Sequence, residues 1–148
     1  MTGLSALTPR EASIFACVCD AVVAPEPVLP PVRETDAVAF FDSWMARAPT
    51  SNRLGMRALL YVLELSPLAV APGTRRTRLR RLDRASRARW LHAIERAPSA
   101  QVRMVAKLVE GAVQLSYYGD DRVLALCGYD PEANVRRGRE LRIAEGRP

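Results

Sequence analysis

The chain has 148 residues and a formal net charge of +6, with 49% hydrophobic and 26% charged residues. This length and composition predict one globular domain, residues 1–148, able to bury about two-thirds of its unfolded surface. The sequence contains no run of 18 apolar residues, which excludes a transmembrane helix. Its first residues lack the basic and apolar regions of a secretory signal, so we expect a cytoplasmic protein.

The first predicted helix starts at a capping box and ends near Val23. Thr8 is followed by Pro9 and, three positions on, by Glu11, a pattern in which two side chains bond the first free N–H groups of a helix. The side expected to be buried carries Ile14, Phe15, Val18, Ala21 and Val22.

A proline-rich connector is predicted for residues 24–33. Four prolines this close together exclude a helix and favour an extended, polyproline-like path. They are Pro25, Pro27, Pro30 and Pro31. Two interpretations remain open, a stiff connector pinned across the bundle and a strap that lies on a partner.

Two further helices are expected, one from about residue 35 to 48 and one from 52 to 65. In the first, the residues predicted to be buried are Val38, Phe41, Trp44 and Met45. The second is apolar nearly all round, which predicts either a central helix or one that faces another protein. A loop is expected at 66–73, because this segment contains Pro67 and Pro72.

Positive charge is concentrated between Thr74 and Arg103. Ten arginines stand against two acids in this segment, giving +8, whereas the rest of the chain sums to −2. Three interpretations remain open: a solvated face, a contact with an acidic patch on a partner, or binding of nucleic acid or anionic lipid. The arginines are at positions 75, 76, 78, 80, 81, 84, 87, 89, 96 and 103.

A fourth helix should be capped by Asp83 and run to about Arg96. Four of its residues are expected to face inward or along the seam between helices, namely Arg87, Trp90, Leu91 and Ile94. His92, the only histidine, falls on the opposite side, so we expect no catalytic or metal-binding role for it.

The longest predicted helix follows Pro98 and Ser99. Its apolar stripe is Val102, Val105, Val109, Ala112, Val113 and Ser116, widened by Met104, Leu108 and Leu115. This wide stripe predicts a central helix, together with the helix at 52–65. The expected fold is all-α, a single-domain irregular bundle of five or six helices.

The long helix leads into the segment from Gln114 to Pro131, QLSYYGDDRVLALCGYDP. Tyr117 and Tyr118 are expected to act as wedges with buried rings and bonded hydroxyls, or as anchors in a subunit interface, and Tyr129 is interpreted in the same way. Gly119 is predicted as a helix C-cap, Asp120 or Asp121 as the cap of a short helix, and Gly128 as its end. Asp130 and Pro131 then close the motif, and the polar extension 132–148 is expected to be a weak helix or a docked tail.

Groups that carry chemistry are scarce. Cys17, Cys19 and Cys127 form neither a zinc pattern nor a disulfide framework and are interpreted as small buried or half-buried side chains. The glycines form no phosphate-binding loop, and there is no haem attachment motif. We therefore predict no catalytic, cofactor-binding or metal site on this chain.

The paired tyrosine that closes a long helix, the short helix after an Asp, and Leu126-Cys-Gly-Tyr-Asp-Pro resemble the small-subunit family known as gluconate 2-dehydrogenase subunit 3. The opening Leu7-Thr-Pro-Arg-Glu-Ala-Ser-Ile-Phe and the proline-rich stretch fit the same family. The resemblance implies a non-catalytic accessory subunit in a hetero-oligomer, whose catalytic partner is a glucose-methanol-choline-type dehydrogenase that carries FAD. Many members of the family resemble exported proteins with a twin-arginine leader, so export with a signal-bearing partner is the alternative to a cytoplasmic location.

The alternative function is a basic helical nucleic-acid-binding protein, and a stand-alone enzyme comes third. The arginine-rich segment favours the first of these, but it has no helix-turn-helix pattern and no stacking aromatic residue beyond Trp90. Nucleic acid is therefore not the partner that we expect.

Overall fold

The computed structural model of the chain describes residues 3–23, 28–70 and 77–144. Helices and turns account for all the regular structure in these ranges, which contain no strand, so the all-α class is confirmed. The elements are α1 (Pro9–Val22), η1 (Val32–Glu34), α2 (Ala37–Arg47), α3 (Thr50–Leu65), α4 (Pro67–Val70), η2 (Leu79–Arg81), α5 (Arg84–Glu95), α6 (Ala100–Tyr117), α7 (Asp121–Leu126) and α8 (Pro131–Ala144). The helices outnumber the five or six expected, because α4 is a separate turn and α8 is a full helix.

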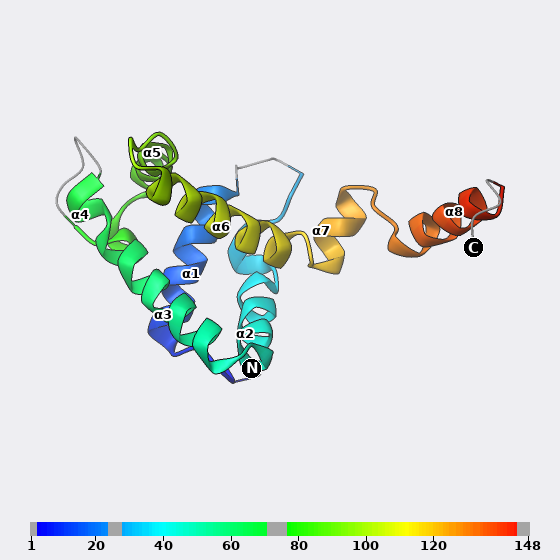
Figure 1. The fold of residues 1–148 in the computed structure, drawn as a ribbon, viewed down its shortest axis with the longest axis horizontal. Helices are drawn as coiled ribbons and strands as arrows, with labels where there is room; N and C mark the ends of the chain where they lie inside the picture. Colours follow the sequence, from blue (N-terminus) through cyan, green and yellow to red (C-terminus); the bar gives the residue numbers. More distant parts are fainter. Residues whose placement is uncertain (1–2, 24–27, 71–76, 145–148) are drawn as a thin grey trace.

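Helix α1 is the one around which the others pack, and it contacts α2, α3, α5 and α6 (Figure 1). It begins at the predicted capping box: the Thr8 hydroxyl accepts from the Glu11 N–H at 3.2 Å, and the Glu11 carboxylate accepts from the Thr8 N–H at 2.8 Å. Ile14, Phe15 and Val18 are buried as predicted, whereas Ala21 and Val22 are half-buried. The prediction that the helices at 52–65 and 100–117 would be the central ones missed α1.

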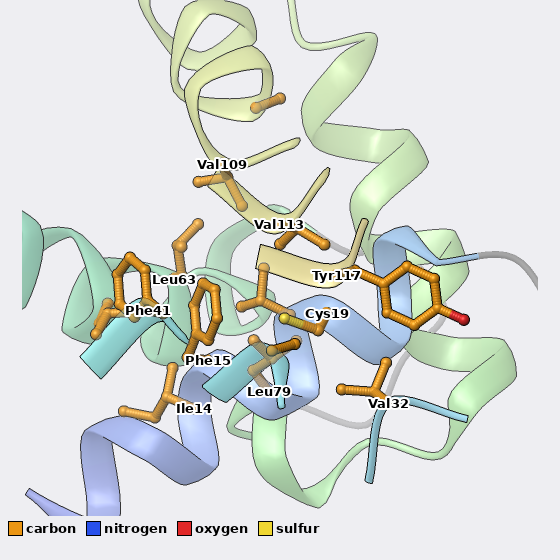
Figure 2. Packing of buried hydrophobic residues seen from close by; sticks show 14 of the residues in the cluster. Ile14, Phe15, Cys19, Val32, Phe41, Leu63, Leu79, Val109, Val113 and Tyr117 are labelled. Atoms are coloured by element: carbon orange, nitrogen blue, oxygen red, sulfur yellow. The ribbon is translucent and has the colours of Figure 1, made fainter. Parts of the chain in front are cut away.

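The core is formed by side chains from α1, α2, α3, α5, α6, α7 and the two 3-10 turns, and Figure 2 shows part of it. The rings of Phe15 and Phe41 stack with centroids 3.8 Å apart and planes 10° from parallel. Trp90 of α5 is fully buried and donates its indole N–H to the Ser66 hydroxyl at 2.8 Å. Such contacts bury large aromatic surface and still satisfy the one polar atom of the indole.

Some residues predicted to be buried in α2 are not. Phe41 and Met45 are buried, but Val38 is half-buried and Trp44 is 43% exposed. Helix α2 packs mainly on α1 and α6, and the side that carries Trp44 is left open. In α5, Trp90 and Ile94 are buried and Leu91 and Arg87 are half-buried, as expected for residues that face inward or along the seam.

Helix α3 is less central than its sequence predicts. It packs on α1, α4 and η2, and its buried residues are Leu60, Leu63 and Glu64. Three of its large apolar residues remain exposed, namely Leu54, Val62 and Leu65. The loop predicted to start at Ser66 is also wrong as far as residue 70, because Pro67 occupies the first position of α4, where a helix tolerates proline. Residues 71–73 of that loop lie outside the described residues.

Helix α8 extends away from the other helices at the carboxyl end of the chain (Figure 1). Pro131 was expected to stop the preceding turn, and it also starts α8. Asp130 caps this helix by accepting the Ala133 N–H at 3.0 Å. The apolar residues Val135, Leu141 and Ile143 are all exposed, so the extension is helical to Ala144 but not docked on the body.

Candidate functional site

An apolar groove of about 400 Å³ runs between α2, α3 and α6. The aromatic residues Phe40 and Trp44 of α2 form one wall, and both are more than a third exposed. The other walls are mostly aliphatic, and the only charged side chain is Lys107, which is paired with Glu110 at 2.9 Å. The lining residues are Phe40, Phe41, Trp44, Met56, Leu59, Lys107, Leu108, Gly111, Ala112, Leu115 and Ser116.

The α6 wall of the groove continues as an exposed apolar row. We call this row the open side of α6 and define it as Met104, Leu108 and Leu115, which are 66%, 61% and 72% exposed. These residues were predicted to widen a buried stripe, and that prediction is wrong. The buried stripe itself is confirmed at Val109, Val113 and Ser116 and is half-buried elsewhere.

Two glycines, one within α6 and one after it, differ in the space around their Cα atoms. A Cβ at Gly111 would meet no atom within 4 Å, so this position is open space at the bottom of the groove. At Gly119, a Cβ would lie 2.7 Å from the Leu115 carbonyl oxygen and 3.4 Å from the Phe40 ring. The C-cap residue is Tyr118, and Gly119 after it is not in the left-handed conformation, so the predicted C-cap glycine is wrong. The neighbour that leaves too little room for a Cβ at Gly119 is the Leu115 carbonyl oxygen.

The proline-rich connector is joined to the end of α6 by Tyr117. This side chain is fully buried, and its hydroxyl, which points out of the core cluster in Figure 2, donates to the Pro30 carbonyl at 2.6 Å. The predicted wedge with a buried ring and a bonded hydroxyl is therefore confirmed at Tyr117. Pro31 is extended and precedes η1, whereas Pro25 and Pro27 lie outside the described residues.

Tyr118 and Tyr129 do not share this arrangement. They are 44% and 51% exposed, so the prediction of buried rings is wrong for both. The Tyr118 ring meets the Tyr117 ring edge-on at a centroid distance of 5.2 Å, and much of the Tyr118 ring remains accessible to solvent. Exposed rings of this kind remain available for an interface.

The Asp120 side chain connects the start of α7 to the start of α2. It caps α7 by accepting the Arg122 N–H at 2.9 Å, and its other oxygen accepts the Asp36 N–H at the start of α2 at 2.8 Å. The side-chain hydrogen bond from Arg122 and these backbone bonds lower the pKa of Asp120 to about 2. The predicted capping role is confirmed, and the contact with α2 is an addition that helix patterns alone do not reveal.

The short helix α7 ends at Gly128 as predicted. Gly128 has φ 67°, and its N–H donates to the Ala125 carbonyl while the Tyr129 N–H donates to that of Leu124. This pair of bonds is the Schellman arrangement, which needs a left-handed residue and so favours glycine. Residues 128–131 therefore form the connection between α7 and α8, and α7 separates this connection from the end of α6 (Figure 1).

Much of the arginine excess is bonded within the protein. Arg80 binds the buried Glu64 through its Nε at 2.9 Å, and Arg87 binds Asp20 at 2.9 Å. Arg103 donates to two carbonyl groups that precede α6. Other arginines have exposed side chains that bond to no other described residue, and these include Arg78, Arg81 and Arg96. Arg75 and Arg76 lie outside the described residues.

Sequence reasoning missed the buried acids. Asp42 accepts the backbone N–H groups of Ser5, Ala6 and Leu7 and the Ser5 hydroxyl, at 2.7–3.0 Å. Burial acts to raise the pKa of Asp42, but these four bonds lower it to about 2. Its position among Val38, Phe41 and Met45 on the inward side of α2 was the available signal.

The few groups with reactive side chains lie apart. Cys19 is buried and Cys17 half-buried as expected, and burial raises the pKa of both thiols, that of Cys19 to about 12. Cys127 is exposed, contrary to expectation, and His92 is exposed as predicted. In the described ranges, His, Cys, Asp and Glu side chains form no group of three that could hold a metal ion.

Within the same ranges, every helix falls short of the length and hydropathy needed to cross a bilayer. Comparison of the chain with protein-family models, curated proteins and solved structures finds no match. The apolar groove is therefore the feature that carries the functional argument.

Proposed function

We propose that this chain is a non-catalytic accessory subunit that binds and stabilises a FAD-dependent glucose-methanol-choline-type oxidoreductase. The observation that carries the proposal is the apolar groove together with the open side of α6. Trp44 of α2 and Leu108 and Leu115 of α6 line this groove, and all three are exposed. Exposed apolar residues that gather over neighbouring helices mark interaction sites. The resemblance of Tyr117 to Pro131 to the small-subunit family supplies the identity of the partner.

In this proposal the groove receives an apolar segment of the catalytic subunit, and FAD, substrate and electrons are handled on that partner. The accessory chain acts by mass action, because a ligand that binds only the folded partner stabilises it. A permanent interface of this kind would bury about 2,000 Å² or more, which exceeds the groove and would include the exposed Tyr118.

The experiment is to purify the tagged chain from its native host and to identify bound flavoprotein by sequence and by the absorption of FAD. A variant that fills the groove, Gly111→Leu, should then weaken the complex, because a Cβ at this position meets open space in the free protein. Ala88→Leu is the matched control, since Ala88 is exposed on α5 and lies outside the groove.

We expect Gly111→Leu to raise the Kd by about tenfold or more, which corresponds to a loss of about 1.4 kcal/mol. Ala88→Leu should leave the Kd unchanged, and the partner should lose thermal stability when the accessory chain is removed. Failure to recover any FAD-containing protein, or oxidation of a substrate by the purified single chain, would contradict the proposal.

Nucleic-acid binding remains the second candidate, and the observation that favours it is α8. Four arginines lie along this exposed helix, at positions 136, 137, 139 and 142. Retention on DNA at physiological ionic strength, with an affinity that falls steeply as salt increases, would support this alternative.

A further inference from the structure

A second hollow, of about 470 Å³, lies between α1, η1 and α5 and shares no lining residue with the apolar groove. It is lined by polar and apolar side chains in similar measure. The hollow lies within the size range of pockets that take small molecules, where a few polar groups fix the ligand and an apolar wall provides most of the contact.

The charged groups of this hollow are unbalanced. Arg33, Arg84 and Arg87 line it, and Asp20 is the only acid that does so. The Asp20 carboxylate is shared, because it lies 2.9 Å from Nη1 of Arg87 and 3.8 Å from Nη1 of Arg84. Arg33 is paired instead with Glu34, at 3.3 Å on the exposed rim. One carboxylate therefore compensates two guanidinium groups at the inner wall.

Arg87 is the cation least accessible to water, with its side chain 17% exposed. Its Nε donates to the Leu79 carbonyl at 3.4 Å and its Nη1 to Asp20. Its Nη2 bonds to none of the described residues. A guanidinium with two donors already fixed by the protein holds the remaining N–H groups in place for an oxyanion.

The lining also contains apolar side chains. It includes Ala16, Val32 and Val38, together with the half-buried Cys17, the pKa of whose thiol is raised by burial. Apolar side chains in the same hollow as two guanidinium groups suit a ligand that has one charged end and one apolar end.

We propose that this hollow binds a small organic anion whose carboxylate or phosphate ester is held by Arg84 and Arg87 and whose apolar body lies against Val32 and Val38. Nothing in the proposed accessory role requires this site, so the two proposals stand independently. Charge-assisted bonds to arginine are about twice as strong as neutral ones, and the shared Asp20 occupies only some of the N–H donors of the two guanidinium groups.

The test uses the full chain and three probes: benzoate, phenyl phosphate, and benzamide as the neutral counterpart of benzoate. Titration calorimetry at constant ionic strength should give saturable binding of at least one anion, about tenfold or more tighter than benzamide. The relative affinity of the two anions then distinguishes a carboxylate ligand from a phosphate ester.

Two arginine variants on α5 make the result specific. Arg84→Gln should weaken anion binding by about tenfold, because this half-exposed side chain supplies one of the two guanidinium groups. Arg96→Gln makes the same change of charge at an exposed position outside the hollow and should leave the affinity unchanged. As a second measurement, in a chain that carries Cys127→Ser, the bound anion should slow alkylation of Cys17 in the wall.

The absence of saturable binding for both anions in the unsubstituted chain would overturn the proposal. Equal affinity for benzoate and benzamide, or an equal loss in Arg84→Gln and Arg96→Gln, would overturn it as well, since the anion would then not be recognised by the guanidinium groups of this hollow.

Discussion

The two sides of α6 are made of the same kinds of residue but have different surroundings. On the covered side, Val113 and Tyr117 are fully buried against α1 and α2, whereas on the open side Leu108 and Leu115 are mostly exposed. The apolar periodicity of α6 identifies residues whose burial would be favourable, but it does not specify which of them the other helices cover. The difference between the two sides therefore separates the residues that stabilise this fold from apolar residues that the fold leaves exposed.

The strongest way to break this comparison is to truncate one residue on each side. Tyr117→Ala should lower the free energy of unfolding by about 3–5 kcal/mol, since it removes a fully buried ring and the bond to Pro30. Leu115→Ala should change it by about 0.5 kcal/mol or less, because Leu115 is 72% exposed. Urea unfolding measures both. Similar losses in the two variants would mean that the open side is covered in the isolated protein.

If Tyr117→Ala does not fold, Tyr117→Phe keeps the ring and removes only the hydroxyl. This variant should cost about 1 kcal/mol, the usual net value of one hydrogen bond. An unchanged stability would show that the connector is not held by the Pro30 carbonyl.

A buried acid on α2, Asp42, binds the residues that precede α1. Asp42→Asn should cost about 1.5–3 kcal/mol, the range for hydrogen bonds to a charged group, because an amide cannot accept on both of its ends. Ser43→Asn, at the exposed neighbouring position of α2, is the control and should have little effect. A loss of the same size in both variants would argue against a specific bond to the N-terminal residues.

The same acids make a pH prediction. The pKa values of Asp42 and Asp120 are about 2 in the folded protein, below their ordinary value of 3.8. A group whose pKa is lowered by folding stabilises the protein above its unfolded pKa, and this contribution is lost as the pH falls through the folded pKa. Stability should therefore decline between about pH 4 and pH 2. The decline should be shallower in Asp42→Asn, and an identical pH dependence would contradict the assignment.

The smallest expected effects compare Gly111, which lines the groove, with Gly119, which follows α6. Gly111→Ala should stabilise the protein by about 0.5–1 kcal/mol, because alanine is the better helix former and its Cβ meets open space. Gly119→Ala should destabilise it by about 1 kcal/mol or more, because its Cβ would lie 2.7 Å from the Leu115 carbonyl oxygen. Thermal unfolding of the two variants gives the sign of each change. Stabilisation by both would contradict the close approach of Gly119 to the Leu115 carbonyl oxygen.

Local signals predicted much of this fold correctly. The capping box at Thr8, the caps at Asp83 and Asp120 and the turn at Gly128 are all confirmed, because each depends on residues only a few positions apart. The all-α class follows from helical periodicity in the same way. For the candidate site, the sequence identified Tyr117 as a wedge but could not name Pro30 as its partner, 87 residues away.

The errors have a common physical cause. Trp44 and Leu115 fit an apolar stripe, but burial depends on which helices the tertiary fold brings alongside, and periodicity does not specify that. Asp42 and Glu64 are the opposite case, because they are acids that the fold buries. Their burial depends on distant partners, Leu7 for Asp42 and Arg80 for Glu64, which helical periodicity does not reveal. The groove and the second hollow both arise from such long-range juxtapositions.

The bond between Tyr117 and Pro30 also constrains the order of events during synthesis. The tyrosine is made 87 residues after the proline. At a synthesis rate of about 5–20 residues per second, the connector is made several seconds before Tyr117, whose hydroxyl binds it. A partner that binds the nascent chain in this interval meets the connector before the bond between Tyr117 and Pro30 has formed. The time of encounter, as well as affinity, then determines which surface the connector contacts.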